Sequence, residues 1–287
     1  MYFKQKIHKK ILSLQAFFSP MLKHILFCLC LLWGFSACNT YQKVLKSSDY
    51  DYKLEKAKEY YNAGAYEKAI PLFEELIGVY KGTRSVEDLY YYYPYCYYGK
   101  GDYILASFYF KNFLEYYPRS DKAEDARYMV AYCYYKMSPS IDLEQTNTQK
   151  AMEAFQLFVN TYPQSDRVEK CNALMDELRR KLEEKAFVGA QLYYDLKDYR
   201  AAVTAYNNLL LDFPETPERE KVHFLIVKSY YLLASNSIYS KQLERFELAE
   251  SAYLDFLNKF PDSKYLREAE KMYTTSLNKI DELKSNN

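Results

Sequence analysis

The sequence of 287 residues contains only 7 Gly, three His and one Trp. So few glycines argue against an all-β fold, which needs frequent tight turns. The histidines are dispersed and no Cys-x-x-Cys pair occurs, so the usual metal-ligand spacings are absent. Gly99-Lys100-Gly101 lacks the spacing and the following hydroxyl of a phosphate loop and is expected to be a turn. We therefore expect no enzyme, no metal site and no dissociable cofactor.

The formal net charge of +1 hides an uneven distribution. Residues 1–37 hold five lysines and no acidic residue, which leaves 34 basic and 38 acidic side chains in the remainder. A chain with this negative balance lacks the basic surface of a nucleic-acid binder. We therefore expect no nucleic-acid partner.

The N-terminal 37 residues have the pattern of a secretory signal. The apolar run Ile25 to Phe35 has 11 residues, whereas a membrane-spanning helix needs roughly 20. It leads into Phe35-Ser36-Ala37-Cys38, which resembles the lipobox of bacterial lipoproteins with Phe where Leu is usual. We predict initiation at Met21, a signal peptide over 1–37, a lipid on Cys38 and a tether over 38–49. The alternative is a buried helix that happens to contain a cysteine.

Three further cysteines, Cys96, Cys133 and Cys171, lie among apolar and aromatic residues in helical patterns. Their odd number and surroundings favour buried free thiols over a disulfide framework. The covalent lipid on Cys38 is therefore the one attached group that we expect.

Five alanines mark an internal repeat that begins near residue 50: Ala69, Ala106, Ala151, Ala202 and Ala249. An aromatic residue follows each by four positions: Phe73, Phe110, Phe155, Tyr206 and Tyr253. A proline follows the last four by twelve positions: Pro118, Pro163, Pro214 and Pro261. Small residues let paired helices approach closely, while large rings fill the space between pairs. This pattern predicts an all-α tetratricopeptide-repeat solenoid of about five helix pairs plus a C-terminal capping helix.

Hydroxyl residues follow each of these prolines by two positions and are expected to cap the next helix. They are Ser120, Ser165, Thr216 and Ser263. Pro94 lies inside a helical run, where it removes a hydrogen bond and should produce a kink.

Intervals between the reference alanines are 37, 45, 51 and 47 residues, against roughly 34 for an uninterrupted array. We assign the excess to loops over Ser138–Gln149 and Ala234–Arg245 and to a long helix. The expected organisation is N-terminal repeats 1–3 over 50–165, a linking helix over 166–195, and repeats 4–5 with the cap over 196–287. The capping helix itself is expected over 264–283.

Tyrosines form two stripes on the first helices of the pairs. One stripe comprises Tyr91, Tyr95 and Tyr98, repeats as Tyr128, Tyr132 and Tyr135, and is extended by Tyr61. A second stripe, Tyr90, Tyr93 and Tyr97, matches core-packing positions. Core burial explains one stripe, so we expect the other to line a peptide-binding groove. The alternative is that both stripes serve packing.

The combination resembles the BamD family, tetratricopeptide lipoproteins of the bacterial outer-membrane β-barrel assembly machinery. The resemblance rests on Cys38, on the junctions Tyr117-Pro118-Arg119-Ser120 and Tyr162-Pro163-Gln164-Ser165, on the Asp/Gln/Thr-rich insertion 142–151, and on the long helix that runs into Ala190-Gln191-Leu192-Tyr193-Tyr194.

This resemblance implies an outer-membrane lipoprotein that faces the periplasm. It implies that the N-terminal pairs receive the C-terminal segments of unfolded outer-membrane β-barrel proteins. It also implies that the C-terminal pairs hold the BamA-like barrel subunit, and we expect this contact within 197–245, including Lys197, Arg200 and Arg219. A periplasmic tetratricopeptide lipoprotein of cell-wall or nutrient-uptake complexes is the alternative.

Overall fold

The computed structural model describes residues 40–285 of the chain, and in this range it contains α-helices and no strand. The predicted signal peptide, the start at Met21 and the lipidation of Cys38 lie outside these residues. The described residues form two compact units that divide between Met137 and Ser138, rather than at the expected boundary after residue 165. The predicted all-α class is confirmed.

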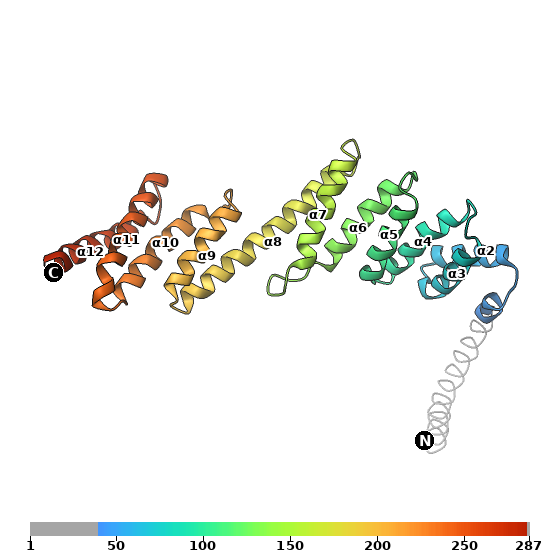
Figure 1. Cartoon of the computed structure of the whole chain (residues 1–287), viewed down its shortest axis with the longest axis horizontal. Helices are drawn as coiled ribbons and strands as arrows, with labels where there is room; N and C mark the ends of the chain where they lie inside the picture. The colour runs from blue at the N-terminus through green and yellow to red at the C-terminus, as the bar shows by residue number, and fades with distance from the viewer. Residues whose placement is uncertain (1–39, 286–287) are drawn as a thin grey trace, which may run out of the picture. The chain divides into compact units, whose positions relative to one another are not determined.

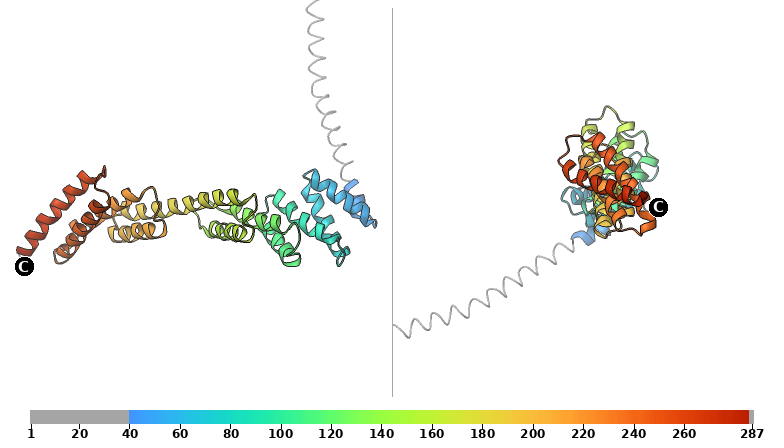
Figure 2. Two further views of the ribbon diagram at one scale, coloured as in Figure 1. Left: turned by 90° about the horizontal axis from the view of Figure 1, so that it is seen from above. Right: turned by 90° about the vertical axis from the view of Figure 1, so that its left-hand side faces the viewer.

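Consecutive helices within each unit pack side by side and are joined by short turns (Figure 1). The first unit holds α2 (Tyr50–Asn62), α3 (Tyr66–Val79), α4 (Val86–Gly99), α5 (Tyr103–Tyr116) and α6 (Ala123–Met137). The second holds α7 (Thr146–Thr161), α8 (Val168–Asp195), α9 (Tyr199–Asp212), α10 (Arg219–Ser235), α11 (Tyr239–Lys259) and α12 (Leu266–Ser285). Figure 2 shows the same helices from two further directions.

The repeat residues form the core of each helix pair. All five reference alanines are 0–2% exposed, and the aromatic residues four positions later are 0–5% exposed. At this spacing an alanine and a ring lie on one face of their helix, one turn apart. The alanine lets a neighbouring helix approach, and the ring fills the space beside it. The predicted packing rule is therefore confirmed in every repeat.

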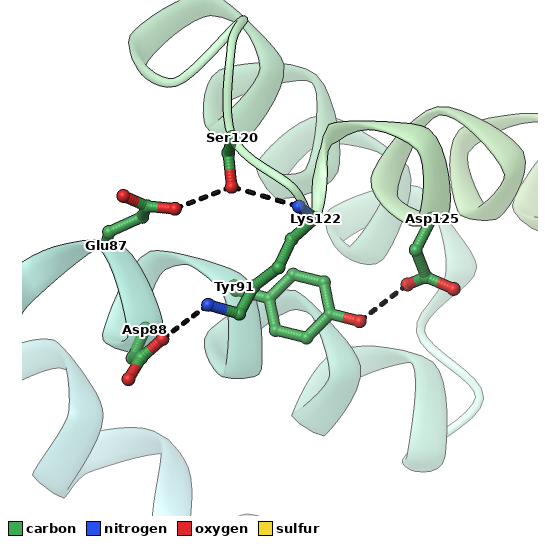
Figure 3. Close-up of polar contacts among 6 residues, drawn as sticks. All are labelled: Glu87, Asp88, Tyr91, Ser120, Lys122 and Asp125. Carbon is green, nitrogen blue, oxygen red and sulfur yellow. Dashed lines mark hydrogen bonds and ion pairs between the residues drawn. The ribbon is translucent and has the colours of Figure 1, made fainter. Parts of the chain in front are cut away.

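Hydroxyl side chains connect successive helix pairs at three junctions. Each oxygen accepts a hydrogen bond from the backbone N–H two residues later and donates one to a glutamate of an earlier helix. The three hydroxyl–glutamate pairs are Ser120 with Glu87, Thr216 with Glu183 and Ser263 with Glu220, each at 2.5 Å. Figure 3 shows the first, beside the ion pair of Lys122 with Asp88. These hydroxyls lie three residues before the next helix begins, so they stabilise the turn that precedes that helix. They are therefore not the helix N-caps that we had expected.

The N-terminal segment 40–45 is helical and packed, although we expected a tether over 38–49. Val44 is fully buried. The ring of Tyr41 lies 5.7 Å from that of Tyr60, and its hydroxyl donates to the Lys68 carbonyl at 3.3 Å. This segment therefore packs against both α2 and α3.

The repeat insertions lie mainly in helices. The expected loop Ala234–Arg245 is wrong: α10 continues to Ser235 and α11 begins at Tyr239, so residues 236–238 alone connect them. The stretch after Tyr239 is rich in strong helix formers, which extend α11 toward its N-terminus. The other insertion leaves a loop over 138–145, shorter than expected because α7 starts at Thr146.

Helix α8, at Val168–Asp195, closely follows the predicted linking helix.

A proline and three cysteines are buried inside helices. Pro94 lies buried inside α4. Cys96, Cys133 and Cys171 are buried free thiols, as predicted. Burial raises the pKa of Cys96 and Cys133 to about 12 each.

Two phenylalanines of α5 test the packing rule directly. Phe110 is fully buried, whereas Phe108 is 54% exposed on the same helix. We expect Phe110→Ala to lower the free energy of unfolding by about 3–5 kcal/mol, because it removes buried contacts and leaves a cavity. Phe108→Ala should change it by less than about 1 kcal/mol. Urea unfolding followed by circular dichroism measures both, and equal losses would contradict the packing rule.

Candidate functional site

Tyr91 and Tyr95 of the predicted groove are bound to the chain itself. The Tyr91 hydroxyl donates to Asp125 Oδ2 at 2.7 Å (Figure 3), and the Tyr95 hydroxyl donates to the same oxygen. Their rings lie 5.7 Å from Phe113 and 4.9 Å from Phe110, respectively. Burial, with the Asp125 carboxylate next to the hydroxyls, raises the pKa of both tyrosines. These two side chains therefore join α4 to α5 and α6.

Four more predicted groove tyrosines form a line of rings from α4 to α6. Tyr128 stacks on Tyr132 and Tyr132 stacks on Tyr135, each with ring centroids 5.6 Å apart. Tyr98 lies 6.2 Å from Tyr132, and burial raises its pKa to about 12. Tyr128 is buried, whereas Tyr98, Tyr132 and Tyr135 are half-buried. Ring packing thus accounts for much of the stripe, as the alternative interpretation expected.

Tyr61, the seventh predicted residue, lines a hollow of about 140 Å³ between α2 and α4. We call this the α2–α4 hollow, and its lining residues are Lys58, Tyr61, Asn62, Asp88 and Tyr92. The rings of Tyr61 and Tyr92 lie 5.2 Å apart, and burial raises the pKa of Tyr61 to about 12. Sequence reasoning missed the other four, Lys58, Asn62, Asp88 and Tyr92. The spacing of Lys58, Tyr61 and Asn62 at i, i+3 and i+4 was the available signal, since it places them on one helix face.

Charges around the α2–α4 hollow leave it with a positive end. The Asp88 carboxylate accepts from Lys122 Nζ at 2.7 Å, so its charge is compensated. Lys58 is exposed and forms no ion pair within residues 40–285. An apolar ring wall and an uncompensated ammonium therefore meet at one small hollow. Such an arrangement suits a side chain that carries a nearby negative charge.

The three predicted partner-binding residues lie at two separate places in the second unit. Lys197 and Arg200 are exposed where α8 meets α9, whereas Arg219 is exposed at the start of α10. The 14 residues of α9 separate the two places by roughly 20 Å. The structure therefore does not bring the three residues together.

Lys197 adopts a left-handed backbone conformation with φ 64°. Its N–H bonds to the Tyr194 carbonyl at 3.0 Å, in the turn geometry that Gly101 adopts between α4 and α5. A side chain in this conformation costs roughly 1–2 kcal/mol. This is backbone strain at a residue that sequence reasoning had singled out.

Arg219 borders a second hollow, of about 350 Å³, between α9, α10 and α11. We call this the α9–α11 hollow. His223 also lines it, with a side chain that is 10% exposed and Nδ1 3.6 Å from Asp255 Oδ2. Burial and then the Lys259 and Arg219 charges lower the pKa of His223, against an opposing effect of Asp255. His223 is therefore largely neutral at pH 7.

Other kinds of site are not indicated within residues 40–285. No group of three His, Cys, Asp or Glu side chains there is arranged to hold a metal ion. None of the helices in this range has the length and apolar character needed to span a bilayer.

Paired helices that share a buried alanine and a ring one turn later make this chain a tetratricopeptide-type protein. The profile of the YfiO family, described as outer membrane lipoproteins, matches residues 48–246. The chain belongs to this YfiO (BamD) family of outer membrane lipoproteins.

Two solved structures are among those to which the chain is similar. The TPR2AB domain of yeast Sti1 in a pHSP90 complex is 17% identical, with a TM-score of 0.38 over 80% of this chain and 98% of that one. The P58(IPK) TPR domain is 13% identical, with a TM-score of 0.39 over 83% and 68% of the two chains. No curated protein matches the sequence.

The lowered pKa of His223 predicts a stability that depends on pH. Because the unfolded chain, with a His pKa near 6.5, binds the proton more readily, stability is present above pH 6.5 and lost as pH falls toward the folded-state pKa. We expect urea midpoints of tag-free protein to fall between pH 7.5 and about 5.5. His223→Gln should flatten this slope, and an unchanged slope would rule out His223 as its source.

Proposed function

We propose that this chain is a lipid-anchored scaffold at the periplasmic face of the outer membrane, which binds unfolded β-barrel proteins and the BamA-like barrel subunit to promote membrane insertion. Family membership supports the membrane assignment, and the lipid would be carried by Cys38. The observation that carries the binding role is the α2–α4 hollow, where ring walls adjoin the Lys58 ammonium.

The α2–α4 hollow has the size of one side chain. A cavity of about 150 Å³ is enough for a benzene ring, and this hollow measures about 140 Å³. Burying an aromatic side chain contributes about 1.5–3 kcal/mol, whereas an exposed ion pair contributes about 0.2–1 kcal/mol. The aromatic residue therefore provides most of the affinity, and Lys58 adds selectivity for a carboxylate beside it. A chain that ends in an aromatic residue offers both groups together.

The other tyrosines of the stripe then have two roles. We assign Tyr91, Tyr95 and Tyr128 to holding the helices in place, since they are bonded or buried. The half-buried rings of Tyr98, Tyr132 and Tyr135 extend the surface for residues further from the end of the bound peptide.

Contact with the barrel subunit is assigned to the second unit. Lys197 and Arg200 offer exposed cations at one end of α9, and Arg219 offers one at the other end. The strained backbone at Lys197 supports a role for that side chain, because such strain is often retained at functional positions.

Lys58 provides a test of the α2–α4 hollow that leaves packing intact. We expect Lys58→Gln to weaken binding of a labelled peptide with a free C-terminal Phe by about three- to fivefold, because it removes one exposed ion pair. Amidating the C-terminus of the peptide should weaken binding to the native chain by a similar factor. It should cause no further loss of affinity for the Lys58→Gln variant. Fluorescence anisotropy measures both effects. The matched control is Lys81→Gln, which changes an exposed lysine in a turn. Equal effects of the two substitutions would refute binding of the peptide C-terminus at the α2–α4 hollow.

The cellular role can be tested by capture from solubilised membranes with the lipidated full chain. We expect the lipidated chain to recover a large β-barrel membrane protein. The Cys38→Ala chain, expressed in intact cells, should not recover it, because the variant lacks the lipid anchor. Recovery of glycans would favour the nutrient-uptake alternative, and recovery of peptidoglycan synthases the cell-wall alternative. Either of these without a β-barrel protein would contradict the proposal.

A further inference from the structure

The α9–α11 hollow combines an apolar wall with a basic rim. Leu211 and Ala252 belong to the wall, and Leu211 is 79% exposed, the largest exposure among the bulky apolar residues described. Arg219 and Lys259 form the rim. This surface lies in the second unit and is distinct from the α2–α4 hollow of the first.

The equivalent positions in the α4–α5 pair of the first unit are occupied by tyrosines. Glu87 of α4 and Glu220 of α10 both accept from the next junction hydroxyl, so they mark the same position in their helices. Three residues later lie Tyr90 and His223, and each contacts the last aromatic residue of its pair. The ring of Tyr90 lies 5.8 Å from Tyr117, and that of His223 lies 5.4 Å from Phe260. This agreement fixes the equivalence of the two sites.

The substitutions between these sites account for the hollow. Ala252 lies three residues after its reference alanine, where the first unit has Tyr109. Tyr109 stacks on Tyr97 at 5.2 Å and contacts Tyr93 at 4.7 Å, so it fills the corresponding space. An alanine at this position removes the ring. The hollow of about 350 Å³ therefore opens at the place where the α4–α5 pair holds an aromatic ring.

Charge at the α9–α11 hollow favours a single anionic group. Asp255 accepts from Lys259 Nζ at 2.8 Å, which compensates both charges. Arg219 donates through Nη1 to the Pro214 carbonyl at 3.2 Å and remains exposed. With His223 largely neutral, one positive charge is uncompensated. A guanidinium with free donors suits a carboxylate.

We propose that the α9–α11 hollow binds an internal loop of a partner protein, in which an aromatic side chain stands next to an Asp or Glu. The ring occupies the space left by Ala252, and the carboxylate pairs with Arg219. This extends the proposed scaffold role by giving the second unit a defined seat. Because the recognised carboxylate belongs to a side chain, the ligand need not be a chain end.

Ala252→Tyr tests the seat by restoring the ring that the first unit carries. The probe is a labelled peptide, acetylated and amidated at its ends, with a central Asp-Phe pair, and binding to the full chain is followed by anisotropy. We expect Ala252→Tyr to weaken binding at least about tenfold, as for loss of a central aromatic anchor. Leu254→Tyr adds the same ring at a 46%-exposed position of α11 and should leave affinity unchanged. Equal effects of the two variants would overturn the proposal.

Arg219→Gln tests the charge separately. Because Arg219 is exposed, the substitution should leave the fold intact. It should abolish the preference for the Asp-Phe over the Asn-Phe peptide while leaving Asn-Phe binding unchanged. A retained preference would contradict the assigned pairing. Tighter binding of a peptide that ends in a free Phe carboxylate would also overturn the proposal, because the α9–α11 hollow would then recognise a C-terminal carboxylate.

Failure here can be told apart from failure of the general scaffold role. The C-terminal Phe peptide is measured on the same samples at the α2–α4 hollow. If that peptide binds and the Asp-Phe peptide does not, the inference about α9–α11 fails alone. If neither binds, both fail.

Discussion

Each helix pair is held together by the close approach of its helices at one buried alanine. A larger side chain there would separate the helices and uncover the ring one turn later, which is also buried in every repeat. Burial of each ring contributes about 1.5–3 kcal/mol, so the five rings together stabilise the helix pairs substantially. The junction hydroxyls then fix how one pair follows the next, because each joins a turn to a glutamate of an earlier helix.

The two proposed binding sites lie at hollows that the packed side chains of the helix pairs leave open. In the first unit, tyrosines fill the surface positions between helices, and a small hollow with an ammonium at its edge stays open. In the second, Ala252 and His223 stand where the α4–α5 pair has Tyr109 and Tyr90, and a larger hollow opens beside a guanidinium. Both sites use the same physical elements, an apolar recess and one uncompensated positive charge.

The sequence predicted those features that depend on helical spacing. The alanine and aromatic positions, the long helix α8 and the buried thiols follow from periodicity and local residue type. Spacing cannot say whether extra residues form loops or lengthen helices, which explains the error at Ala234–Arg245. It also identifies a helix face without identifying what packs on that face. For this reason the tyrosine stripe was found, while the hydrogen bonds of Tyr91 and Tyr95 to Asp125 were not. The α2–α4 hollow was missed because Tyr92 comes from a different helix than Lys58.

Hydrogen–deuterium exchange of the full chain can locate a bound polypeptide without any substitution. On addition of an unfolded β-barrel protein with an aromatic C-terminus, we expect slower exchange in the facing segments of α2 and α4, around residues 58–62 and 88–92. Exchange that stays unchanged in these segments while the ligand is bound would contradict the proposed binding at the α2–α4 hollow.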